Sequence, residues 1–328
     1  MQKKERVRAA LAGAAVDRPP AGFWGHDFRR EWSAEGLAAA MLERFHAHDW
    51  DYMKVNPRAT YYAEAWGCRY APSGNASEGP VTQDYVLKSA ADLASVQRIS
   101  GTGGVFAEQL AALRLIGDGI GGADFIQTVF SPLSVVGRLA GPDGLGTVRG
   151  WMESEPVLLH DALAAVADTL AEYATACLAA GASGIFFATT EWATRNNLPP
   201  ELYARFGRPY DLRVLAVVQG AELNVLHVCR SHNILAELLD YPVHAFNWAD
   251  REAGNPSLAE GQARTDKAVM GGVTQATIAL GSPADVRAQV RDAVAATGGR
   301  RLLIAPGCSV SPQTPAANLQ AAREAVAT

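Results

Sequence analysis

Three residues of this chain carry side chains that bind metal ions well: His227, Cys229 and Cys308. His227 and Cys229 stand at the end of an apolar segment, and residues two apart in a strand point to the same face. A single His-x-Cys pair is common by chance, and a histidine on an apolar strand is often a core residue. If the fold brings Cys308 to the same point, one imidazole and two thiolates form a good Zn²⁺ site. Its open fourth position is the mark of a catalytic zinc.

The predicted site has a specific chemistry. Zinc with thiolate ligands can bind a further thiol and hold it deprotonated, because the metal ion lowers the pKa of the groups that bind it. A thiolate is a far better nucleophile than a thiol. The site therefore favours attack by a substrate thiol on an electrophilic carbon, such as that of a methyl group.

The elements that must position these residues alternate between short apolar segments and helical patterns. The apolar segments that predict strands cover residues 21–25, 52–56, 125–130, 184–188, 223–228, 243–248, 269–273 and 302–306. Helical patterns cover 36–48, 157–180, 200–219 and 282–296, the last beginning with the start signal Ser282-Pro283. Strands that alternate with helices predict a parallel sheet. Eight of them favour an α/β fold of the closed (β/α)8 TIM barrel type, formed by residues 1–328 as a single domain.

Two segments lie outside this alternation. Residues 1–20 predict an N-terminal helix that covers the floor of the barrel. Residues 61–93, after the second strand, contain Pro72, Gly74 and Pro80, which interrupt a helical pattern. We interpret this segment as an insertion that forms a hairpin or a lid over the mouth of the barrel.

The carboxyl ends of barrel strands build the active site, and this rule gives further candidates. We expect catalytic roles for Glu191 and His26, and substrate contacts from Asp27, Asn56, Asn247 and Gln275. For Glu191 the alternatives are a general base, a fourth zinc ligand, a partner of His227, or a carboxylate at a helix start. For Asp27 the alternative is a capping residue with a structural role only.

The composition argues against several classes of function. The net charge of -5 disfavours nucleic-acid binding, which needs clustered Lys and Arg. No apolar run reaches the roughly 18 residues expected of a membrane span, and the N-terminal residues do not match a secretory signal. We therefore expect a cytoplasmic protein with no membrane partner, in which the four cysteines are reduced.

Several motifs of the chain match a known family. They are Gly281-Ser282-Pro283, Ile304-Ala305-Pro306-Gly307-Cys308, the segment Pro312-Gln313-Thr314-Pro315-Ala316-Ala317-Asn318 and the loop Val129-Phe130-Ser131-Pro132-Leu133. In these motifs the chain resembles the uroporphyrinogen decarboxylase superfamily, including its closing Pro-x-Thr-Pro-x-x-Asn segment. The resemblance covers nearly the whole chain and implies a (β/α)8 barrel.

The superfamily contains at least two chemistries. Resemblance to the decarboxylases implies a metal-free reaction on a carboxylated tetrapyrrole, which they hold with an Arg-Gln-Ala-Gly-Arg loop after the first strand. The equivalent stretch here, 22–30, lacks that motif, although it ends in Arg29 and Arg30. A tetrapyrrole with eight carboxylates needs more positive charge than this chain offers. A metal-free decarboxylase of a tetrapyrrole or a smaller acid is the alternative function.

The other branch comprises zinc-dependent corrinoid:thiol methyltransferases, whose His-x-Cys pair and distant Cys are matched at His227, Cys229 and Cys308. The resemblance implies that these residues bind Zn²⁺. It also implies methyl transfer from a corrinoid, carried by a partner protein, to a small-molecule thiol. The branch often has Gly after the pair, whereas Arg230 follows here, which leaves the donor and the acceptor open. A third hypothesis is a non-catalytic protein that binds a corrinoid or porphyrin. The resemblance also implies that the protein could form a homodimer, as relatives often do.

Overall fold

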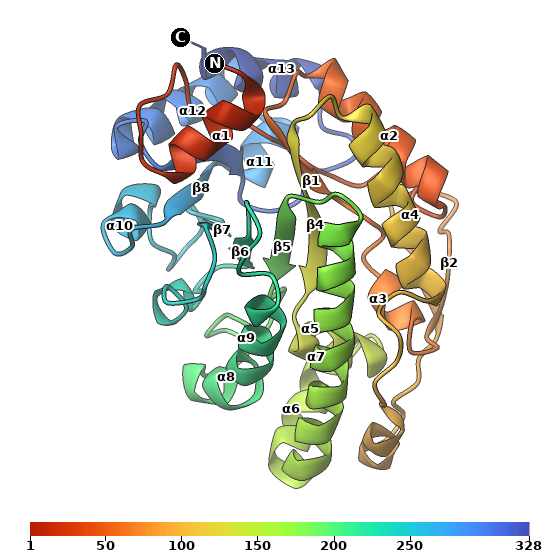
Figure 1. The fold of residues 1–328 in the computed structure, drawn as a ribbon. Helices are drawn as coiled ribbons and strands as arrows, with labels where there is room; N and C mark the ends of the chain where they lie inside the picture. Colours follow the sequence, from red (N-terminus) through yellow and green to blue (C-terminus); the bar gives the residue numbers. More distant parts are fainter. Residues whose placement is uncertain (328) are drawn as a thin grey trace.

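The structure, a computed structural model, describes residues 1–327. Its centre is a seven-stranded parallel sheet in the order β1-β4-β5-β6-β7-β8-β9. The sheet curls around an interior and the helices lie outside it (Figure 1). Its strands confirm seven of the eight expected segments; they are β1 (Tyr52–Val55), β4 (Asp124–Phe130), β5 (Gly184–Ala188), β6 (Val225–Val228), β7 (Ala245–Trp248), β8 (Ala268–Val273) and β9 (Leu302–Pro306).

Helices lie between these strands along the chain, and several of them pack against the outer face of the sheet. The expected helix at 200–219 is divided at Gly207, because Pro209 has no N–H with which to continue the preceding helix. The helices are α2 (Ala34–Ala47), α4 (Gly104–Gly119), α5 (Pro132–Leu139), α6 (Gly144–Ser154), α7 (Pro156–Ala179), α8 (Pro200–Phe206), α9 (Arg208–Ala216), η2 (Leu235–Glu237), α10 (Leu258–Gln262), α11 (Gln275–Leu280), α12 (Pro283–Thr297) and α13 (Ala316–Ala325).

Residues along each strand alternate between two hydrophobic clusters. One cluster fills the interior of the curled sheet and includes Leu303 of β9, whereas the next residue, Ile304, belongs to the larger cluster. This alternation is the period of two of a β-strand. In β6, Val225 belongs to the interior cluster, so His227 points inward as well.

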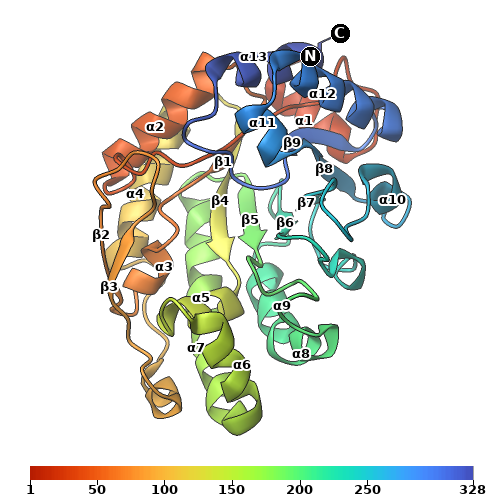
Figure 2. The same cartoon turned by 180° about the vertical axis from the view of Figure 1, so that it is seen from behind.

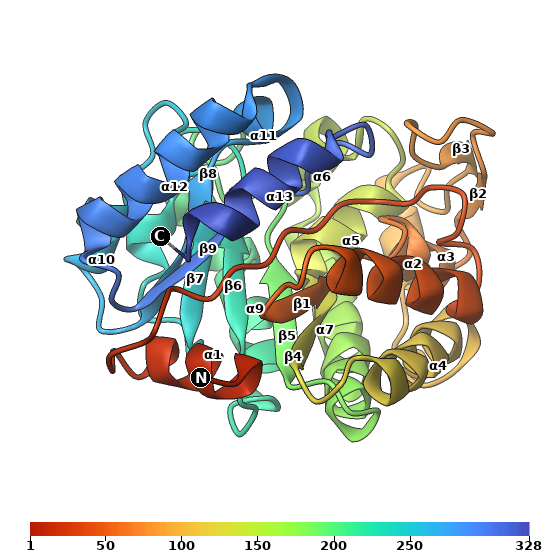
Figure 3. The ribbon, with the colours of Figure 1, turned by 90° about the horizontal axis from the view of Figure 1, so that it is seen from above.

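The expected first strand, 21–25, is wrong as a strand. This segment makes only two isolated bridges, to β9 and to the residues after β9. Two of the backbone groups that would form a ladder bind side chains instead: the Asp51 carboxylate accepts from the Ala21 N–H at 2.9 Å, and Arg44 donates to the Gly25 carbonyl at 2.6 Å. Figure 3 shows the segment running between β9 and β1. Its backbone bonds on both sides: the Gly22 N–H donates to the Ile304 carbonyl at 3.1 Å, and the Asp51 N–H donates to the Ala21 carbonyl at 2.9 Å.

The N-terminal helix α1 (Lys3–Leu11) covers the floor, as predicted, where the strands begin (Figure 1). Two buried carboxylates hold it there. Arg6 donates to Asp51, which precedes β1, at 2.6 Å, and Arg8 donates to Asp124, the first residue of β4, at 2.9 Å. The helix is therefore fastened to the sheet by ion pairs.

The expected insertion after β1 contains a small antiparallel hairpin, seen beside α4 in Figure 2. Between its two strands the chain carries Ser77, whose hydroxyl accepts from Gln313 Nε2 at 2.9 Å, so the hairpin contacts the loop after β9. The elements of the insertion are α3 (Tyr61–Glu64), β2 (Arg69–Ala71), β3 (Val81–Asp84) and η1 (Ala90–Ser95).

Helix α7 is long and apolar enough to cross a membrane, by length and composition alone. Half of its apolar window is buried inside the protein, where the helix contacts β4 and β5. The expectation that no run reaches this length holds only for uninterrupted runs, because α7 also carries Asp168 and Glu172. Its burial is that of a core helix.

Candidate metal centre

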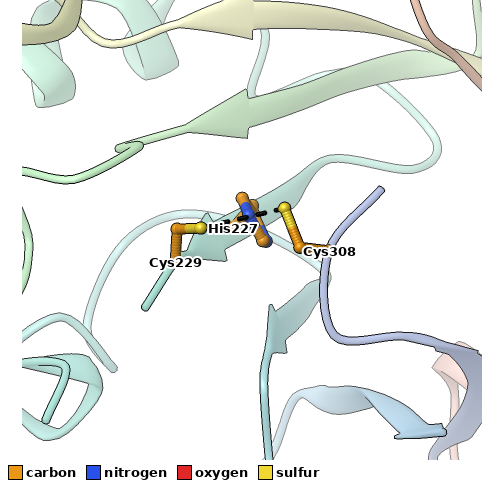
Figure 4. Close-up of side chains that lie close together, drawn as sticks. All are labelled: His227, Cys229 and Cys308. Atoms are coloured by element: carbon orange, nitrogen blue, oxygen red, sulfur yellow. Dashed lines mark hydrogen bonds between the residues drawn. The ribbon is translucent and has the colours of Figure 1, made fainter. Parts of the chain in front are cut away.

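Three side chains converge at the carboxyl ends of the strands. His227 lies in β6, Cys229 follows β6 directly, and Cys308 lies two residues beyond β9. The ring nitrogen and the two sulfurs lie within 4.8 Å of one another, and Figure 4 shows the side chains grouped around one point. His227 is buried and both cysteines are half-buried. The fold thus brings together the three residues that the sequence analysis selected.

The two sulfurs have the spacing of metal ligands. Zn–S bonds are about 2.3 Å long, so tetrahedral geometry places two ligand sulfurs about 3.8 Å apart. The sulfurs of Cys229 and Cys308 are 3.8 Å apart, and the four cysteines are free, as expected. The Cys229 thiol donates a hydrogen bond to Cys308, which lowers the pKa of Cys308 well below its ordinary value and raises the pKa of Cys229. Sulfur and imidazole donors at this spacing fit Zn²⁺.

The proton on the His227 ring is assigned by its neighbour. The side-chain nitrogen of Asn247 donates to the carbonyls of Met270 and Pro306 at 2.9 and 3.1 Å, so its oxygen is free to accept. That oxygen lies 2.6 Å from His227 Nδ1. Nδ1 therefore carries the hydrogen, and the lone pair is on Nε2. A second polar group that fixes the tautomer in this way is typical of metal-binding histidines.

The three residues line a cavity of about 260 Å³. The aromatic side chains of Trp24, Tyr62, Phe130 and Phe186 form much of the remaining wall. Cavities that hold drug-sized ligands measure about 300–1,000 Å³. This cavity therefore suits a small molecule that reaches the sulfur and nitrogen atoms.

Comparison with protein families agrees with the fold and the site. The sequence model described as "Uroporphyrinogen decarboxylase (URO-D)" matches residues 2–328. The chain belongs to the uroporphyrinogen decarboxylase family. The resemblance predicted from the closing motifs of the sequence is therefore confirmed.

This family member has curated relatives of two kinds. It is 25% identical to the methylcobamide:CoM methyltransferase MtaA of Methanosarcina barkeri, over 97% of this chain and 95% of the relative. It is 23% identical to the methylcobamide:CoM methyltransferase MtbA of Methanosarcina acetivorans over the same shares. A uroporphyrinogen decarboxylase of Prochlorococcus marinus is 27% identical over 54% of this chain and only half of its own length. The alignments with the methyltransferases are thus the more complete ones.

Solved structures support the fold of this family member. A methyltransferase from Methanosarcina mazei superposes with a TM-score of 0.80 at 20% identity, covering 99% of this chain and 98% of the other. A B12-independent methionine synthase from Shewanella gives a TM-score of 0.60 at 12% identity, over 89% of this chain and 86% of the other. At these identities the likeness shows a shared fold.

The other predicted site residues of this family member divide into two groups. His26, Asn56 and Glu191 line the cavity. Asp27 binds Arg30 at 2.7 Å through its carboxylate, and Gln275 begins α11; neither is among the residues that line the cavity. Asn247, expected to contact substrate, lies behind His227 with all its polar atoms bonded.

Two of the cavity-lining residues from the predicted set have informative partners. The Nδ1 atom of His26 lies 3.0 Å from both carboxylate oxygens of Glu31, which is 1% exposed. Nε2 of His26 is therefore the ring nitrogen left for a ligand. The Asn56 oxygen accepts from Lys54 and Ser309, whereas its buried Nδ2 has no partner within residues 1–327. This amide has a donor available for a ligand.

Sequence reasoning missed Glu31, Lys54 and Arg138. Lys54 lines the cavity, and its ammonium lies 4.9 Å from the centre of the Phe186 ring. Burial lowers the pKa of Lys54 to about 7, although the nearby Cys308 opposes the shift. Lys54 is two residues before Asn56 in a strand, so the period of two would have placed both side chains on one face. Nothing in the sequence marks Arg138 or Glu31.

Proposed function

We propose that this protein is a zinc-dependent methyltransferase that moves a methyl group from a corrinoid or another methyl donor to a thiol. The observation that carries the proposal is the convergence of His227, Cys229 and Cys308 on one small cavity, with metal-ligand spacing between the sulfurs. The relatives aligned over nearly the whole chain are named as methylcobamide:CoM methyltransferases, which supports the same reaction class. We further propose that residues 21–25 complete a (β/α)8 barrel between β9 and β1.

The chain's own residues would hold the ion and keep it ready. His227 Nε2 and the sulfurs of Cys229 and Cys308 are the three ligands, and Asn247 holds the imidazole in the tautomer that can bind. A zinc ion bound here supplies one chemical property, which is that it keeps a further thiol deprotonated and nucleophilic. Three protein ligands leave room for that thiol.

Other groups of the cavity wall have roles that follow from their partners. Glu31 orients the ring of His26. The Nε2 atom of His26 faces the cavity and accepts the proton that the substrate thiol loses. The Nδ2 atom of Asn56 donates to a polar group of the substrate. The ammonium of Lys54 faces the cavity near Cys308 and offsets the negative charge of the thiolates.

The size of the cavity bears on the donor. At about 260 Å³ it is smaller than the usual site of a drug-sized ligand, and a corrin or porphyrin macrocycle is larger than such ligands. The macrocycle therefore stays at the mouth while its methyl group reaches the thiol sulfur. The same argument disfavours decarboxylation of a tetrapyrrole inside this cavity.

Metal analysis of the purified protein tests the proposal. We expect about one zinc per chain, lost in Cys308→Ala and in His227→Ala, and retained in the matched control Cys177→Ala, which removes a buried thiol of α7. The intact protein should also transfer a methyl group from methylcobalamin to a thiol. Less than about a tenth of an equivalent of zinc, unchanged by Cys308→Ala, would overturn the proposal.

Decarboxylation is separated from methyl transfer by a second measurement. Some relatives are named as uroporphyrinogen decarboxylases, so uroporphyrinogen should be offered to the protein and to Cys229→Ser. We expect no turnover by either protein. Decarboxylation that survives Cys229→Ser would replace the methyltransferase with the metal-free alternative.

A further inference from the structure

Two opposite charges line the cavity beside the cysteines and are not bonded to each other. Arg138 lies in the last turn of α5, and Glu191 follows β5 by three residues. Both side chains are partly buried. Within residues 1–327, neither forms an ion pair with any other residue, although the Arg138 guanidinium donates a hydrogen bond to the Tyr62 hydroxyl. Charges that are partly withdrawn from water and have no counter-charge are unfavourable unless a ligand supplies one.

The two elements that carry these charges are fastened together. Ser134 Oγ of α5 and Thr190 Oγ1 are 2.7 Å apart. Gly137 of α5 has no side chain, and a Cβ there would lie 2.5 Å from the Trp192 ring, so the helix and the loop pack closely. Arg138 and Glu191 adjoin these contacts and are therefore held at a fixed separation.

Backbone strain sets the position of Glu191. Thr190 has a φ of 49°, a left-handed conformation that a β-branched residue rarely adopts. Such a conformation persists only when the surroundings impose it, and it is commonest at ligand sites. Here the bond to Ser134 holds Thr190 in place, and the next residue, Glu191, faces the cavity.

A tyrosine determines where Arg138 lies. The hydroxyl of Tyr62 acts most strongly on Arg138 and raises its pKa, and Glu191 acts in the same direction. Tyr62 is itself 2% exposed and its ring centre is 4.2 Å from that of Phe130. Arg138 is thus near enough to Glu191 for the two charges to interact, but its hydrogen bond is to the Tyr62 hydroxyl and not to the Glu191 carboxylate.

We infer that the acceptor is an amino-acid thiol, with its carboxylate bound by Arg138 and its ammonium bound by Glu191. This inference rests on the proposed function, because the third point of contact is the sulfur beside Cys229 and Cys308. An α-amino acid with a short thiol side chain carries the three groups that this wall of the cavity matches. The guanidinium offers paired donors to a carboxylate, and the Glu191 carboxylate accepts from an ammonium.

Glu191 also discriminates against other thiols. A thiol that carries only a carboxylate places its negative charge beside Glu191 and leaves that group without a partner. A thiol that carries only an ammonium places its positive charge beside Arg138 and leaves the guanidinium without a counter-charge. Specificity that rests on one attractive and one repulsive charge is a general means of rejecting partial matches.

Four thiols of the same chain length test the inference in a two-by-two design. Cysteine carries both charges, 3-mercaptopropionate only the carboxylate, 2-aminoethanethiol only the ammonium, and 2-mercaptoethanol neither. Their affinities are measured by visible absorption of the Co²⁺-substituted protein, which reports sulfur binding without turnover. Homocysteine, longer by one methylene, shows which chain length fits. We expect cysteine or homocysteine to bind at least about tenfold more tightly than either singly charged thiol.

Variants then assign each charge to its residue. Arg138→Met should remove the advantage of cysteine over 2-aminoethanethiol and leave its advantage over 3-mercaptopropionate. Glu191→Gln should do the reverse. The exposed pair Arg149→Met and Glu153→Gln on α6 is the matched control and should keep the wild-type ratios. Arg138→Lys, which keeps the positive charge, should restore part of the preference if Arg138→Met folds poorly.

The outcomes separate this inference from the function on which it rests. If all four thiols change the spectrum with equal affinity, the inference is wrong and the thiol-binding function stands. If Arg138→Met weakens every thiol by the same factor, its role is structural and the inference is also wrong. If no thiol changes the spectrum of a Co²⁺-loaded protein, both the inference and the proposed function fail.

Discussion

The buried Asp51 at the floor of the sheet is paired with two arginines, whereas Lys54 and Arg138 at the mouth have no carboxylate bound to them in the part of the chain that the structure describes. At the floor, Asp51 is fully buried and accepts from Arg6 at 2.6 Å, from Arg18 at 2.6 and 2.9 Å, and from a backbone N–H. At the mouth, the ammonium of Lys54 has an amide oxygen and two aromatic rings around it, and no carboxylate bound to it within residues 1–327. Arg138 likewise has no carboxylate bound to it within residues 1–327.

The difference separates charges that hold the fold from charges held for a ligand. A buried ion pair is internally satisfied, and removal of one partner leaves the other charge unpaired and costs about 3–5 kcal/mol. A buried charge without a partner already carries that cost. Its removal should stabilise the protein and abolish the function, and the following variants test this reasoning.

The largest effect is expected at the floor, for Asp51→Asn. Loss of the carboxylate removes the acceptor shared by the buried Arg6 and the partly buried Arg18, although Arg6 keeps its bonds to Asp17. We expect the free energy of unfolding to fall by about 3–5 kcal/mol, measured by urea denaturation. The metal site is at the opposite end of the strands, so the folded fraction should still bind zinc.

Asp17→Asn is the matched control for the floor. Asp17 also binds Arg6, at 2.7 Å, but its side chain is 43% exposed. Exposed pairs contribute about 0–1 kcal/mol, so the loss of stability should be small. Equal losses in Asp17→Asn and Asp51→Asn would contradict the importance of burial in this comparison.

The second effect concerns zinc affinity. Asn247→Ala removes the oxygen that holds the proton on His227 Nδ1 and should weaken zinc binding by about 10–100-fold, measured by competition with a chelator. The control is Asn224→Ala, which removes a fully buried amide just before β6, at the floor. It should lower stability and leave zinc affinity unchanged. An equal loss of affinity in both variants would assign Asn247 a structural role only.

The sequence predicted most of the sheet and the metal ligands because both follow from local patterns. Apolar runs separated by helical periods predicted seven of the strands, and the period of two placed His227 and Cys229 on one face. The expected strand at 21–25 failed for a non-local reason. The Asp51 carboxylate takes a backbone donor of that segment, and no local pattern reports such a bond.

The wall of the cavity was harder to predict for the same reason. Arg138 enters the site from a helix, not from a strand end, and Glu31 acts through His26. Asn247 was correctly located at a strand end, but its direction depends on the carbonyls of Met270 and Pro306. Partners of this kind become visible only when the strands are placed side by side.

The third effect is a gain in stability, for Lys54→Met. The variant removes a buried charge without a carboxylate and keeps a side chain of similar length. We expect the free energy of unfolding of the metal-free protein to rise by about 1–2 kcal/mol at pH 6, while thiol binding weakens. Lys267→Met, at a side chain that is 40% exposed, should change neither.

The gain in Lys54→Met should depend on pH. The pKa of Lys54 is about 7 in the folded protein because burial disfavours its charge, against 10.5 ordinarily. Between these values the unfolded chain binds one more proton, so wild-type stability rises with pH. The difference between wild type and Lys54→Met is therefore largest below pH 7 and shrinks up to about pH 10. A difference that is constant over this range would show that Lys54 does not titrate as proposed.

The last effect, a slope of at most about 1.4 kcal/mol per pH unit, is expected for a buried carboxylate that forms no ion pair within residues 1–327. Asp211 accepts from the hydroxyls of Tyr203 and Tyr241 at 2.7 and 2.9 Å, and burial raises its pKa from 3.8 to about 7. Between these values the folded protein binds more protons than the unfolded chain, so stability falls as pH rises and is constant above about pH 7. The free energy of unfolding is measured by urea denaturation from pH 4 to pH 8. Asp211→Asn should remove its slope with pH, whereas Asp240→Asn, at an exposed position, should keep that slope. A slope that survives Asp211→Asn would come from other groups, and Asp211 would then be ionised in the folded protein with hydroxyl donors as its only partners. Buried charges could in that case persist without a counter-charge, and the unpaired charges at the mouth would need no ligand to explain them.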